Sequence, residues 1–299
     1  MPLQVQVQCP AKVNLFLEVT GKRRDGYHLL ATLFAKVGLF DVIEAERTDE
    51  PGFALEIVDE AGQGLQAGPD NLVLRAANAM RAEFGLGYGA RLRLIKRIPM
   101  GAGLGGGSSD AAGTLLALAR LNRLEMDRSA MARVRKLAPR LGADVPFFLR
   151  REGFSDARGI GDKFKVLEIP KALPWMVLAW PGVHCPTPEA YKRLLRPAAP
   201  VVLTRLGQLD RLKKRLAAGR PLADWEGLLF NRLEDAVLGF RPEVRQAKDI
   251  LVKTGLRGVL MSGSGASVFG FAGSHREAEA AAGRLAAYPW KVYVISCLG

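Results

Sequence analysis

The segment from Pro99 to Asp110 is the part of this sequence whose composition most directly implies chemistry, because five of the seven residues from Gly101 to Gly107 are glycines. Without Cβ atoms, such a segment can bring successive backbone N–H groups against a ligand, and a helix that begins directly behind it adds its positive N-terminal end. Phosphate is the ligand that this arrangement favours, and a flexible connector is the alternative. The predicted phosphate-binding residues are Pro99, Met100, Gly101, Ala102, Gly103, Leu104, Gly105, Gly106, Gly107, Ser108 and Ser109.

Three known classes of phosphate-binding loop differ from this segment. A Walker loop needs a lysine directly after its second glycine, and Gly107 stands in that place here. The dinucleotide-binding fingerprint matches at glycines 101, 103 and 106, but its strand is buried on both faces, whereas residues 90–98 alternate basic and apolar side chains. The protein-kinase glycine loop comes with His-Arg-Asp and Asp-Phe-Gly motifs, which this sequence lacks. The segment therefore belongs to a fourth class.

The elements on either side of the glycine segment indicate a sheet with helices on one side. Residues 13–20 and 90–98 both have the period-two pattern of half-buried strands. Asp70-Asn71 is expected to cap a helix that runs to Glu83, and Ser108-Ser109-Asp110 to open a second helix over residues 111–121. These elements predict an antiparallel or mixed sheet covered by helices.

The second half of the chain predicts another layer. We expect strands at 175–180, 258–262, 267–271 and 291–296, helical material from 188 to 237 with a loop at 197–200, and helices at 242–254 and 275–287. The order helix-strand-strand-helix-strand, taken with the strand at 175–180, is that of a ferredoxin-like layer. The predicted fold class is therefore α+β.

The overall composition is that of a packed chain, with 48% hydrophobic and 24% charged residues. Met1 to Cys9 alternates like a strand and has neither the pattern of a signal peptide nor the length of a membrane span. Cys9, Cys185 and Cys297 lie far apart and have no metal-ligand spacing, which favours a reducing compartment. A cytoplasmic location is expected.

The net charge of +13 raises a different possibility, a nucleic-acid-binding protein that uses the basic strand 90–98 against phosphates. Such proteins interleave aromatic residues with Lys and Arg. Only 7% of residues are aromatic, and the densest basic cluster, Arg211 to Arg215, has the spacing of a solvated helix face. The sequence disfavours a nucleic-acid partner, but the alternative stays open at this point.

The glycine segment, Pro-x-x-x-Gly-Leu-Gly-x-Gly-Ser-Ser, resembles the ATP-binding motif of the GHMP kinases. Further segments sharpen the resemblance toward one family within this superfamily, the 4-diphosphocytidyl-2-C-methyl-D-erythritol kinases of the non-mevalonate isoprenoid pathway. They occur in the family's order along nearly the whole chain. The four segments that point to this family are Pro10–Leu17, Arg24–His28, Leu141–Phe148 and Pro181–Pro188. A fifth, Ser262–Ser267, resembles the C-terminal glycine motif of the whole superfamily.

The resemblance implies a two-domain GHMP kinase fold, with an ATP-binding and catalytic domain over residues 1–154 and a second domain over 155–299 that completes the substrate cleft. It implies ATP-dependent phosphorylation of the 2-position hydroxyl of 4-diphosphocytidyl-2-C-methyl-D-erythritol. Asp144 matches the family's catalytic base and Lys12 its electrostatic partner, roles that suit phosphoryl transfer. On its own, Asp144 would as readily be a turn residue before Val145-Pro146.

The resemblance also implies how the acceptor is held. Tyr191 would stack on the cytosine ring and His28 would hydrogen-bond its edge. Taken alone, the turn signal Asp25-Gly26 makes an ordinary hairpin end the simpler interpretation of Tyr27 and His28. The residues that match acceptor-binding positions are Asn14, Tyr27, His28, Thr187 and Tyr191.

The expected cofactors are ATP as co-substrate and Mg²⁺ bound with it, touching Ser108 or Ser109. No metal site built by the protein is expected, and His184 and His275 are given no role, because the three histidines have no ligand spacing. Two positions depart from the family pattern: Arg232 stands where an acidic residue is common, and Leu29 where threonine is frequent. Another GHMP kinase, acting on homoserine or mevalonate, is the alternative, although such enzymes have no cytosine to hold.

Overall fold

The computed structural model describes residues 4–195 and 197–299, apart from the side chain of Glu125. The chain forms two compact units that interleave in sequence. Unit 1 contains residues up to Ala11, Leu39–Met100 and Gly105–Arg151, and unit 2 contains Lys12–Gly38, Gly101–Leu104 and Glu152–Gly299. The division of the chain into domains at residue 154 stays a prediction, and the first three residues of the predicted N-terminal strand lie outside the described part.

Two long strands, β1 (Gln4–Lys22) and β2 (His28–Thr48), contribute to both units. In unit 1, β4 (Gly89–Lys96) pairs antiparallel with β2 and parallel with β3 (Phe53–Asp59). Along β4 the side chains of residues 92 and 94 are buried and those of 91 and 93 are exposed. The predicted mixed sheet with a half-buried strand at 90–98 is therefore confirmed.

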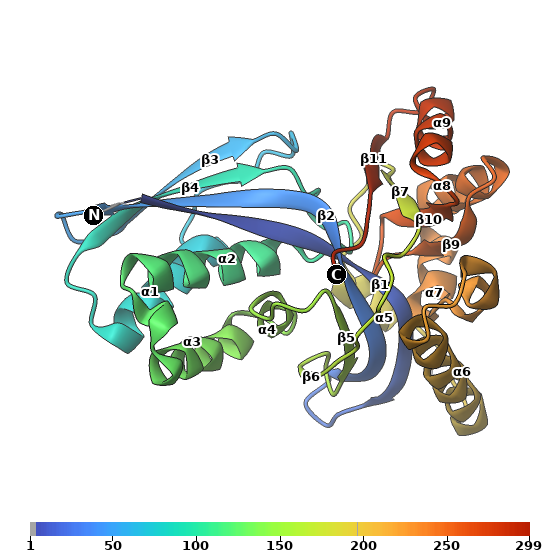
Figure 1. Cartoon of the computed structure of the whole chain (residues 1–299), viewed down its shortest axis with the longest axis horizontal. Coiled ribbons are helices and arrows are strands. Elements are labelled where there is room, and N and C mark those ends of the chain that lie inside the picture. The colour runs from blue at the N-terminus through green and yellow to red at the C-terminus, as the bar shows by residue number, and fades with distance from the viewer. Residues whose placement is uncertain (1–3, 196) are drawn as a thin grey trace. The chain divides into compact units, whose positions relative to one another are not determined.

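Helices α1 (Leu72–Phe84), α2 (Gly106–Leu121) and α3 (Arg128–Leu141) lie on one side of the unit 1 sheet, as predicted (Figure 1). A one-turn helix, α4 (Val145–Phe148), follows, and a 3-10 turn, η1 (Leu124–Met126), precedes α3. Asn71 caps α1 by accepting the Val73 N–H, which confirms the predicted start. The sequence interpretation did not include α3, whose surface is strongly basic.

The predicted start of α2 is wrong. The helix begins at Gly106, five residues before the expected Ala111, and its N-cap is Gly105, which makes no side-chain hydrogen bond. A Cβ on Gly106 would lie 2.9 Å from Lys96 Nζ and 3.0 Å from Ile98 Cγ2, so the first helical turn packs where only glycine fits. Tertiary packing has overridden the low helix propensity of glycine and the capping preference of serine.

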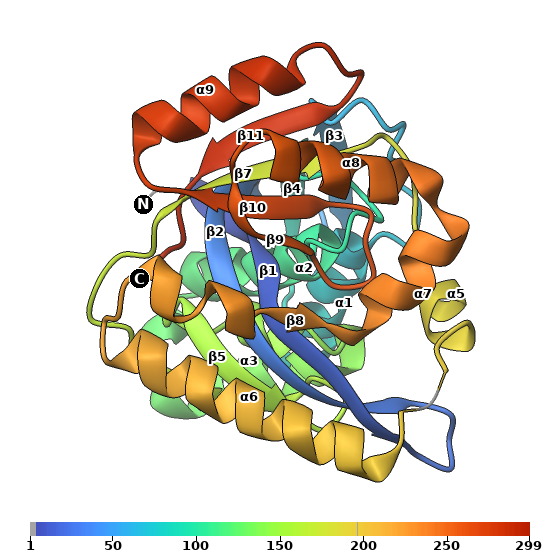
Figure 2. The ribbon, with the colours of Figure 1, turned by 90° about the vertical axis from the view of Figure 1, so that its right-hand side faces the viewer.

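Unit 2 contains a four-stranded antiparallel sheet in the order β11-β7-β10-β9 (Figure 2). Its strands are β7 (Trp175–Trp180), β9 (Arg257–Met261), β10 (Val268–Ala272) and β11 (Lys291–Ile295). Helices α8 (Pro242–Lys253) and α9 (His275–Leu285) pack against it. The predicted ferredoxin-like layer is confirmed, with element ends within about two residues of those expected.

The region predicted as helical from 188 to 237 is interrupted. It holds α5 (Thr187–Lys192), α6 (Ala199–Ala217), the 3-10 turns η2 (Leu222–Asp224) and η3 (Glu226–Leu228), the short strand β8 (Phe230–Asn231) and α7 (Arg232–Phe240). β8 forms by parallel pairing with Phe16 and Leu17 of β1, and a two-residue strand carries no periodicity of its own. α6 also begins inside the predicted loop 197–200, because proline is accepted in a first helical turn.

Two further strands, β5 (Phe154–Arg158) and β6 (Lys163–Val166), add to the sheet beside β2 in unit 2. β5 pairs antiparallel with residues 32–35 of β2, and β6 pairs antiparallel with β5.

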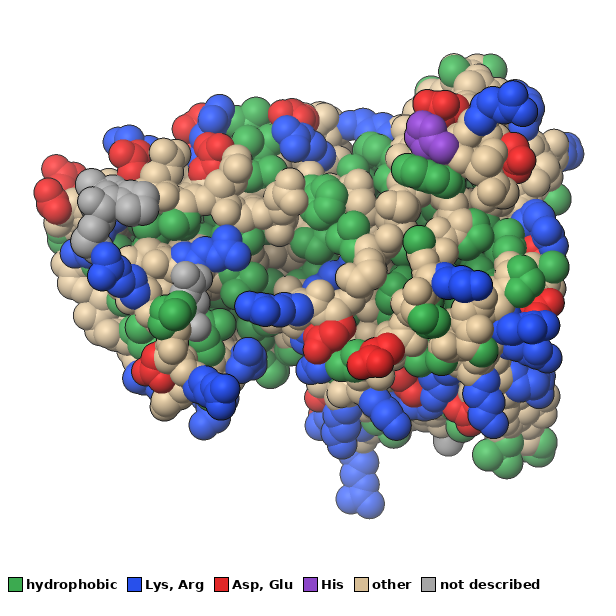
Figure 3. Space-filling model, viewed as in Figure 1, with side chains coloured by type: hydrophobic (Ala, Val, Ile, Leu, Met, Phe, Trp, Pro, Cys, Tyr) green, Lys and Arg blue, Asp and Glu red, His purple; other side chains and the backbone are tan. Residues whose placement is uncertain are grey.

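The positive charges of strand β4 are paired with acidic side chains of the neighbouring strands. Arg91 pairs with Glu46, and Arg93 pairs with Glu44 and Glu56. On the face in Figure 3, Lys and Arg side chains are likewise interspersed with Asp and Glu.

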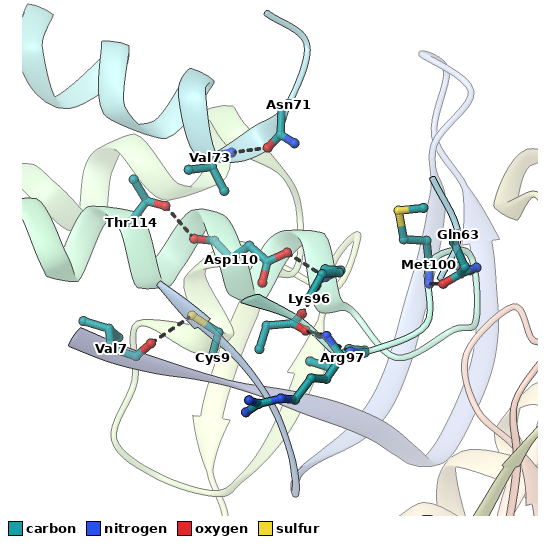
Figure 4. Close-up of polar contacts among 12 residues, drawn as sticks. Val7, Cys9, Gln63, Asn71, Val73, Lys96, Arg97, Met100, Asp110 and Thr114 are labelled. Atoms are coloured by element: carbon teal, nitrogen blue, oxygen red, sulfur yellow. Dashed lines mark hydrogen bonds and ion pairs between the residues drawn. The ribbon is translucent and has the colours of Figure 1, made fainter. Parts of the chain in front are cut away.

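A buried ion cluster joins the strands of unit 1 to α2. The Lys96 ammonium lies 2.5 Å from Asp41 Oδ2 and 2.6 Å from Asp110 Oδ2 (Figure 4). Asp41 Oδ1 also accepts the backbone N–H groups of residues 97 and 98. Burial raises the pKa of Asp110 to about 8; the Lys96 ammonium works against this shift and the charge of Asp41 adds to it. One lysine therefore serves two aspartate side chains.

We expect Asp110→Asn to flatten the dependence of stability on pH. The carboxyl has a reference pKa of 3.8, so between about pH 4 and 8 the folded chain holds a proton that the unfolded chain lacks. Wild-type stability should therefore fall as the pH rises from 6 to 8, by up to about 1.4 kcal/mol per pH unit for this group. Urea unfolding of both proteins at pH 6, 7 and 8 measures the difference, and parallel curves would show that Asp110 does not titrate in this range.

Candidate active site

The glycine segment is a loop between β4 and α2, as predicted. Gly101, Gly103 and Gly105 have φ angles of 60°, 75° and 71°, which L side chains rarely adopt. Since the α2 N-cap makes no side-chain hydrogen bond, the first-turn N–H groups are left for another acceptor, the arrangement that suits an anion. Residues 101–104 belong to unit 2, and the other predicted loop residues belong to unit 1.

The serine pair at the start of α2 is divided between two environments. Ser109 is buried, and its hydroxyl has no hydrogen-bond partner among the described residues. Ser108 is half-buried and lies close to Gly142, where a Cβ would be 3.6 Å from the serine Oγ. Of the two predicted hydroxyls, Ser108 is therefore the one at the surface of the first helical turn.

Asp144 lies in the same unit as α2 and two residues beyond Gly142. It occupies the N-cap position of α4, but its carboxylate does not cap that helix. α4 packs against both α2 and α3, and this packing sets the position of the segment 142–144 beside the first turn of α2. The turn 142–144, which carries the Asp144 carboxylate, therefore lies close to the N-terminus of α2, whose N-cap makes no side-chain hydrogen bond.

In unit 2, Lys12 is held by a chain of polar side chains. Its Nζ donates to Asn14 Oδ1 at 2.7 Å, Asn14 Nδ2 donates to Thr32 Oγ1 at 2.7 Å, and Thr32 Oγ1 donates to the carbonyl of Phe16. The side chains of residues 12 and 14 share one face of β1 and are 5% and 1% exposed. The Lys12 ammonium also lies 5.2 Å from the centre of the Phe34 ring. Lys12 is thus a positioned cation, and Asn14 is its partner.

Both glycine-rich segments of unit 2 close on this lysine. The Lys12 N–H donates to the carbonyl of Leu104, and the Ser262 hydroxyl donates to the carbonyl of Gly103. Gly263 has a φ of 55°, and a Cβ there would lie 3.2 Å from Lys12 Nζ. The C-terminal glycine motif therefore borders the lysine directly, a role for Gly263 that the sequence interpretation did not assign.

Asn231 holds the C-terminal glycine motif in place. Its Nδ2 donates to the carbonyls of Met261 and Gly263, both at 2.8 Å, while its Oδ1 caps α7 by accepting the Leu233 N–H. From the same helix, Glu234 accepts the N–H of Met261. The sequence interpretation did not include these contacts, whose partners lie some 30 residues away along the chain.

The departure at Arg232 is explained by a buried partner. Its guanidinium donates to both carboxylate oxygens of Glu18, at 2.8 and 2.6 Å, and Glu18 is fully buried. Hydrogen bonding to Glu18 raises the pKa of Arg232, although burial works in the opposite direction. The basic residue at this position therefore compensates an acidic one on β1.

Three of the five residues predicted to hold the acceptor, His28, Thr187 and Tyr191, take part in two side-chain contacts. The rings of His28 and Tyr191 stack at 4.7 Å and 20°, and the hydroxyls of Thr187 and Ser264 are hydrogen-bonded at 2.9 Å. Burial, together with the nearby charge of Lys22, lowers the pKa of His28, so the imidazole is neutral at pH 7. A neutral imidazole offers one N–H donor and one acceptor, which suits the edge of a nucleobase.

Tyr27 and His184 have different surroundings. Tyr27 is 60% exposed, and the stacked pair beside it is made by His28 and Tyr191. His184, to which no role was given, lies against the glycine loop: a Cβ on Gly101 would lie 1.6 Å from its Nδ1. The backbone N–H of Cys185 also donates to the carbonyl of Gly101, so the segment 184–185 supports the start of the loop.

Within the described ranges, no cluster of three His, Cys, Asp or Glu side chains could hold a metal ion. In the same part of the chain, no helix combines the length and apolar composition needed to cross a bilayer.

Comparison with known proteins identifies one family. Residues 71–152 match the GHMP kinases N terminal domain, and residues 208–289 match the GHMP kinases C terminal domain. A 4-diphosphocytidyl-2-C-methyl-D-erythritol kinase of Chlorobaculum tepidum is 38% identical over 94% of this chain and 93% of its own length. One of Thermus thermophilus is 40% identical over 93% of this chain and 92% of its own.

Solved structures agree. A crystal structure of 4-(cytidine 5'-diphospho)-2C-methyl-D-erythritol kinase, 37% identical, has a TM-score of 0.80 and covers 99% of this chain and 100% of that chain. Homoserine kinase from Cytophaga hutchinsonii, at 20% identity, has a TM-score of 0.77 over 99% of this chain and 95% of that chain, which shows a shared fold. The chain therefore belongs to the 4-diphosphocytidyl-2-C-methyl-D-erythritol kinase family of the GHMP kinases, and it is an ATP-dependent small-molecule kinase.

Proposed function

We propose that this kinase transfers the γ-phosphate of ATP to the 2-position hydroxyl of 4-diphosphocytidyl-2-C-methyl-D-erythritol. The observation that carries the phosphoryl-transfer part is the cluster in which two glycine-rich segments, 101–104 and 262–267, close on the Lys12 ammonium. The acceptor is supported by the names of relatives that are 37–40% identical over at least 88% of this chain. The pair of His28 and Tyr191 supplies a fitting surface for a nucleobase.

Asp144 is proposed as the base that takes the proton of the attacking hydroxyl, and Lys12 as the cation that stabilises negative charge on the transferring phosphoryl group. Phosphoryl transfer depends on an oriented nucleophile and on positive charge near the equatorial oxygens. The Asn14 side chain keeps the lysine in position through one hydrogen bond. The position of Asp144, two residues beyond the Gly142 that borders Ser108, supports its role.

ATP is proposed to place its phosphates on the loop 99–109 and the uncapped first turn of α2. Mg²⁺ is proposed to bind with ATP, since the Ser108 hydroxyl offers a hard oxygen donor of the kind that this ion prefers. Bound there, the ion would neutralise charge on the phosphates. Ser109 is less suited because its side chain is buried.

Two alternatives can be tested directly. A homoserine or mevalonate kinase activity would appear as ADP release with those alcohols and none with the cytidine derivative. Nucleic-acid binding is disfavoured further by the cross-strand pairs that neutralise Arg91 and Arg93. A filter-binding titration that shows specific affinity at physiological salt would favour it again.

Asp144→Asn should fold and bind ATP but lose turnover by about 10²- to 10⁴-fold, because the amide keeps the shape and cannot accept the proton. Steady-state kinetics and calorimetry of ATP binding measure the two effects. Asp127→Asn is a matched control, since Asp127 is also an N-cap aspartate of unit 1 and uses its side chain to cap α3. Retention of more than about a tenth of the activity in Asp144→Asn would reduce this residue to a positioning role.

Gly105→Val should abolish ATP binding, because a branched side chain blocks the approach of the phosphate to the backbone. The substitution also strains a residue with a φ of 71°, so Gly85→Val is needed as a control; Gly85 has a φ of 64° at the C-cap of α1. Both variants should lose similar stability in circular-dichroism melts, and only Gly105→Val should lose ATP affinity. Unchanged ATP affinity in a folded Gly105→Val protein would refute the phosphate-binding loop.

Tyr191→Ala should raise KM for the acceptor by about ten- to hundredfold, the equivalent of about 1–3 kcal/mol of base stacking, and leave KM for ATP unchanged. Tyr191→Phe should be nearly silent, because the ring stacks and the hydroxyl does not contribute. Initial rates with each substrate varied in turn measure both constants. Equal increases in the two KM values would indicate that the tyrosine only packs beneath the site, and would remove this support for a cytidine-bearing acceptor.

A further inference from the structure

The loop between β3 and α1 is organised by a single carboxylate. Asp59 accepts the backbone N–H groups of four residues that follow it, at 2.7–3.4 Å. Burial alone would raise the pKa of Asp59, but these N–H groups outweigh it and lower the pKa, so the carboxylate is charged at neutral pH. A charged acceptor with several backbone donors is a strong local constraint. The residues it holds are Gly62, Gln63, Gly64 and Leu65.

This loop is also tied to the chain that leaves β4. The N–H of Ala61 donates to the carbonyl of Lys96 at 2.8 Å, and the carboxylate of Glu60 accepts from the Arg97 side chain at 2.7 Å. The loop therefore runs beside the segment that leads into the glycine loop, and all of these residues belong to unit 1.

At the end of this arrangement, the Gln63 amide binds both polar backbone groups of Met100. Its Oε1 accepts the Met100 N–H at 2.6 Å, and its Nε2 donates to the Met100 carbonyl at 3.3 Å (Figure 4). Two bonds to one residue fix its orientation as well as its position. Met100 is bonded directly to Gly101, the first of the left-handed glycines.

We propose that Gln63 is a positioning residue for ATP: it holds the residue from which the glycine loop begins, and so orders that loop for the phosphates. This inference rests on the proposed use of residues 99–109 as the ATP loop. Glycines with positive φ have no side chains by which to be held, and ordering them on binding costs conformational entropy. A contact that orders the start of the loop beforehand lowers that cost and increases affinity.

A purely structural role for Gln63 predicts a different pattern. The side chain is only half-buried, so its removal should cost little stability. If it merely supported the fold of unit 1, any loss would appear as a lower melting temperature and would affect ATP and the acceptor alike. A positioning role instead predicts a selective effect on ATP.

The test is Gln63→Met, which keeps the length of the side chain and removes both hydrogen bonds. We expect Kd for the Mg²⁺ complex of a non-hydrolysable ATP analogue, measured by calorimetry without acceptor, to rise about five- to thirtyfold. KM for ATP should rise in parallel, with kcat and KM for the acceptor within about twofold of wild type. Hydrogen exchange of the Met100 amide should become faster, because its acceptor is lost.

Gln66→Met is the matched control, because Gln66 lies in the same loop and its amide donates to the carbonyl of Gly64 rather than to Met100. It should leave ATP affinity unchanged. The proposal is overturned if Gln63→Met leaves the Kd of the analogue unchanged, if Gln66→Met raises it equally, or if KM for the acceptor rises to the same extent. Failure of the ATP loop itself is distinguishable, since Gly105→Val would then also retain ATP affinity, whereas loss of affinity in Gly105→Val alone would overturn only the role of Gln63.

Discussion

The surroundings of Lys12 depend on one constraint: the backbones of segments 101–104 and 262–267 lie so close together that side chains at residues 103 and 263 would not fit. A Cβ on Gly103 would lie 2.1 Å from the carbonyl oxygen of Ser262, and one on Gly263 would lie 3.0 Å from that of Gly103. These obstacles are backbone atoms, which cannot rotate away as the end of a side chain can. The two segments can therefore meet beside the lysine only because residues 103 and 263 have no side chains, and the Ser262 hydroxyl is accommodated there by donating to the carbonyl of Gly103.

Each unit contains a group of largely buried, paired charges. Lys96 lies between two carboxylates behind the first turn of α2, and Glu18 is joined to Arg232 by two hydrogen bonds. Such groups contribute little net stability when paired, but losing one partner leaves an uncompensated buried charge and is costly. Their effect is to specify where β4, α2 and α7 lie, and these are the elements that carry the glycine loop and the support of the C-terminal glycine motif.

The segments proposed to bind ATP are backbone segments held by a small number of side chains to which no reactive role is assigned. Asn14 holds the cation, Asn231 holds the C-terminal glycine motif, and Gln63 and His184 contact the start of the glycine loop. The three amide side chains make hydrogen bonds, to a lysine ammonium in the case of Asn14 and to backbone groups in the other two, and the ring of His184 packs against Gly101. A glycine-rich loop loses much conformational entropy when it is ordered, and the free energy of these contacts offsets that loss.

The sequence by itself determined the α+β class, the ferredoxin-like layer, the glycine loop and the family, because each depends on local periodicity or on residue types in a fixed order. It misplaced the start of α2, missed β8 within a region expected to be helical, and did not show what Asn231, Gln63 or Arg232 contacts. The start of α2 depends on residues eight and ten positions away, and the other features arise from pairs of residues some 30 to 214 positions apart. Only the tertiary structure decided them, since the space beside Gly106, the strand partner of Phe230 and the acceptors of a side-chain amide are properties of distant segments brought together by packing.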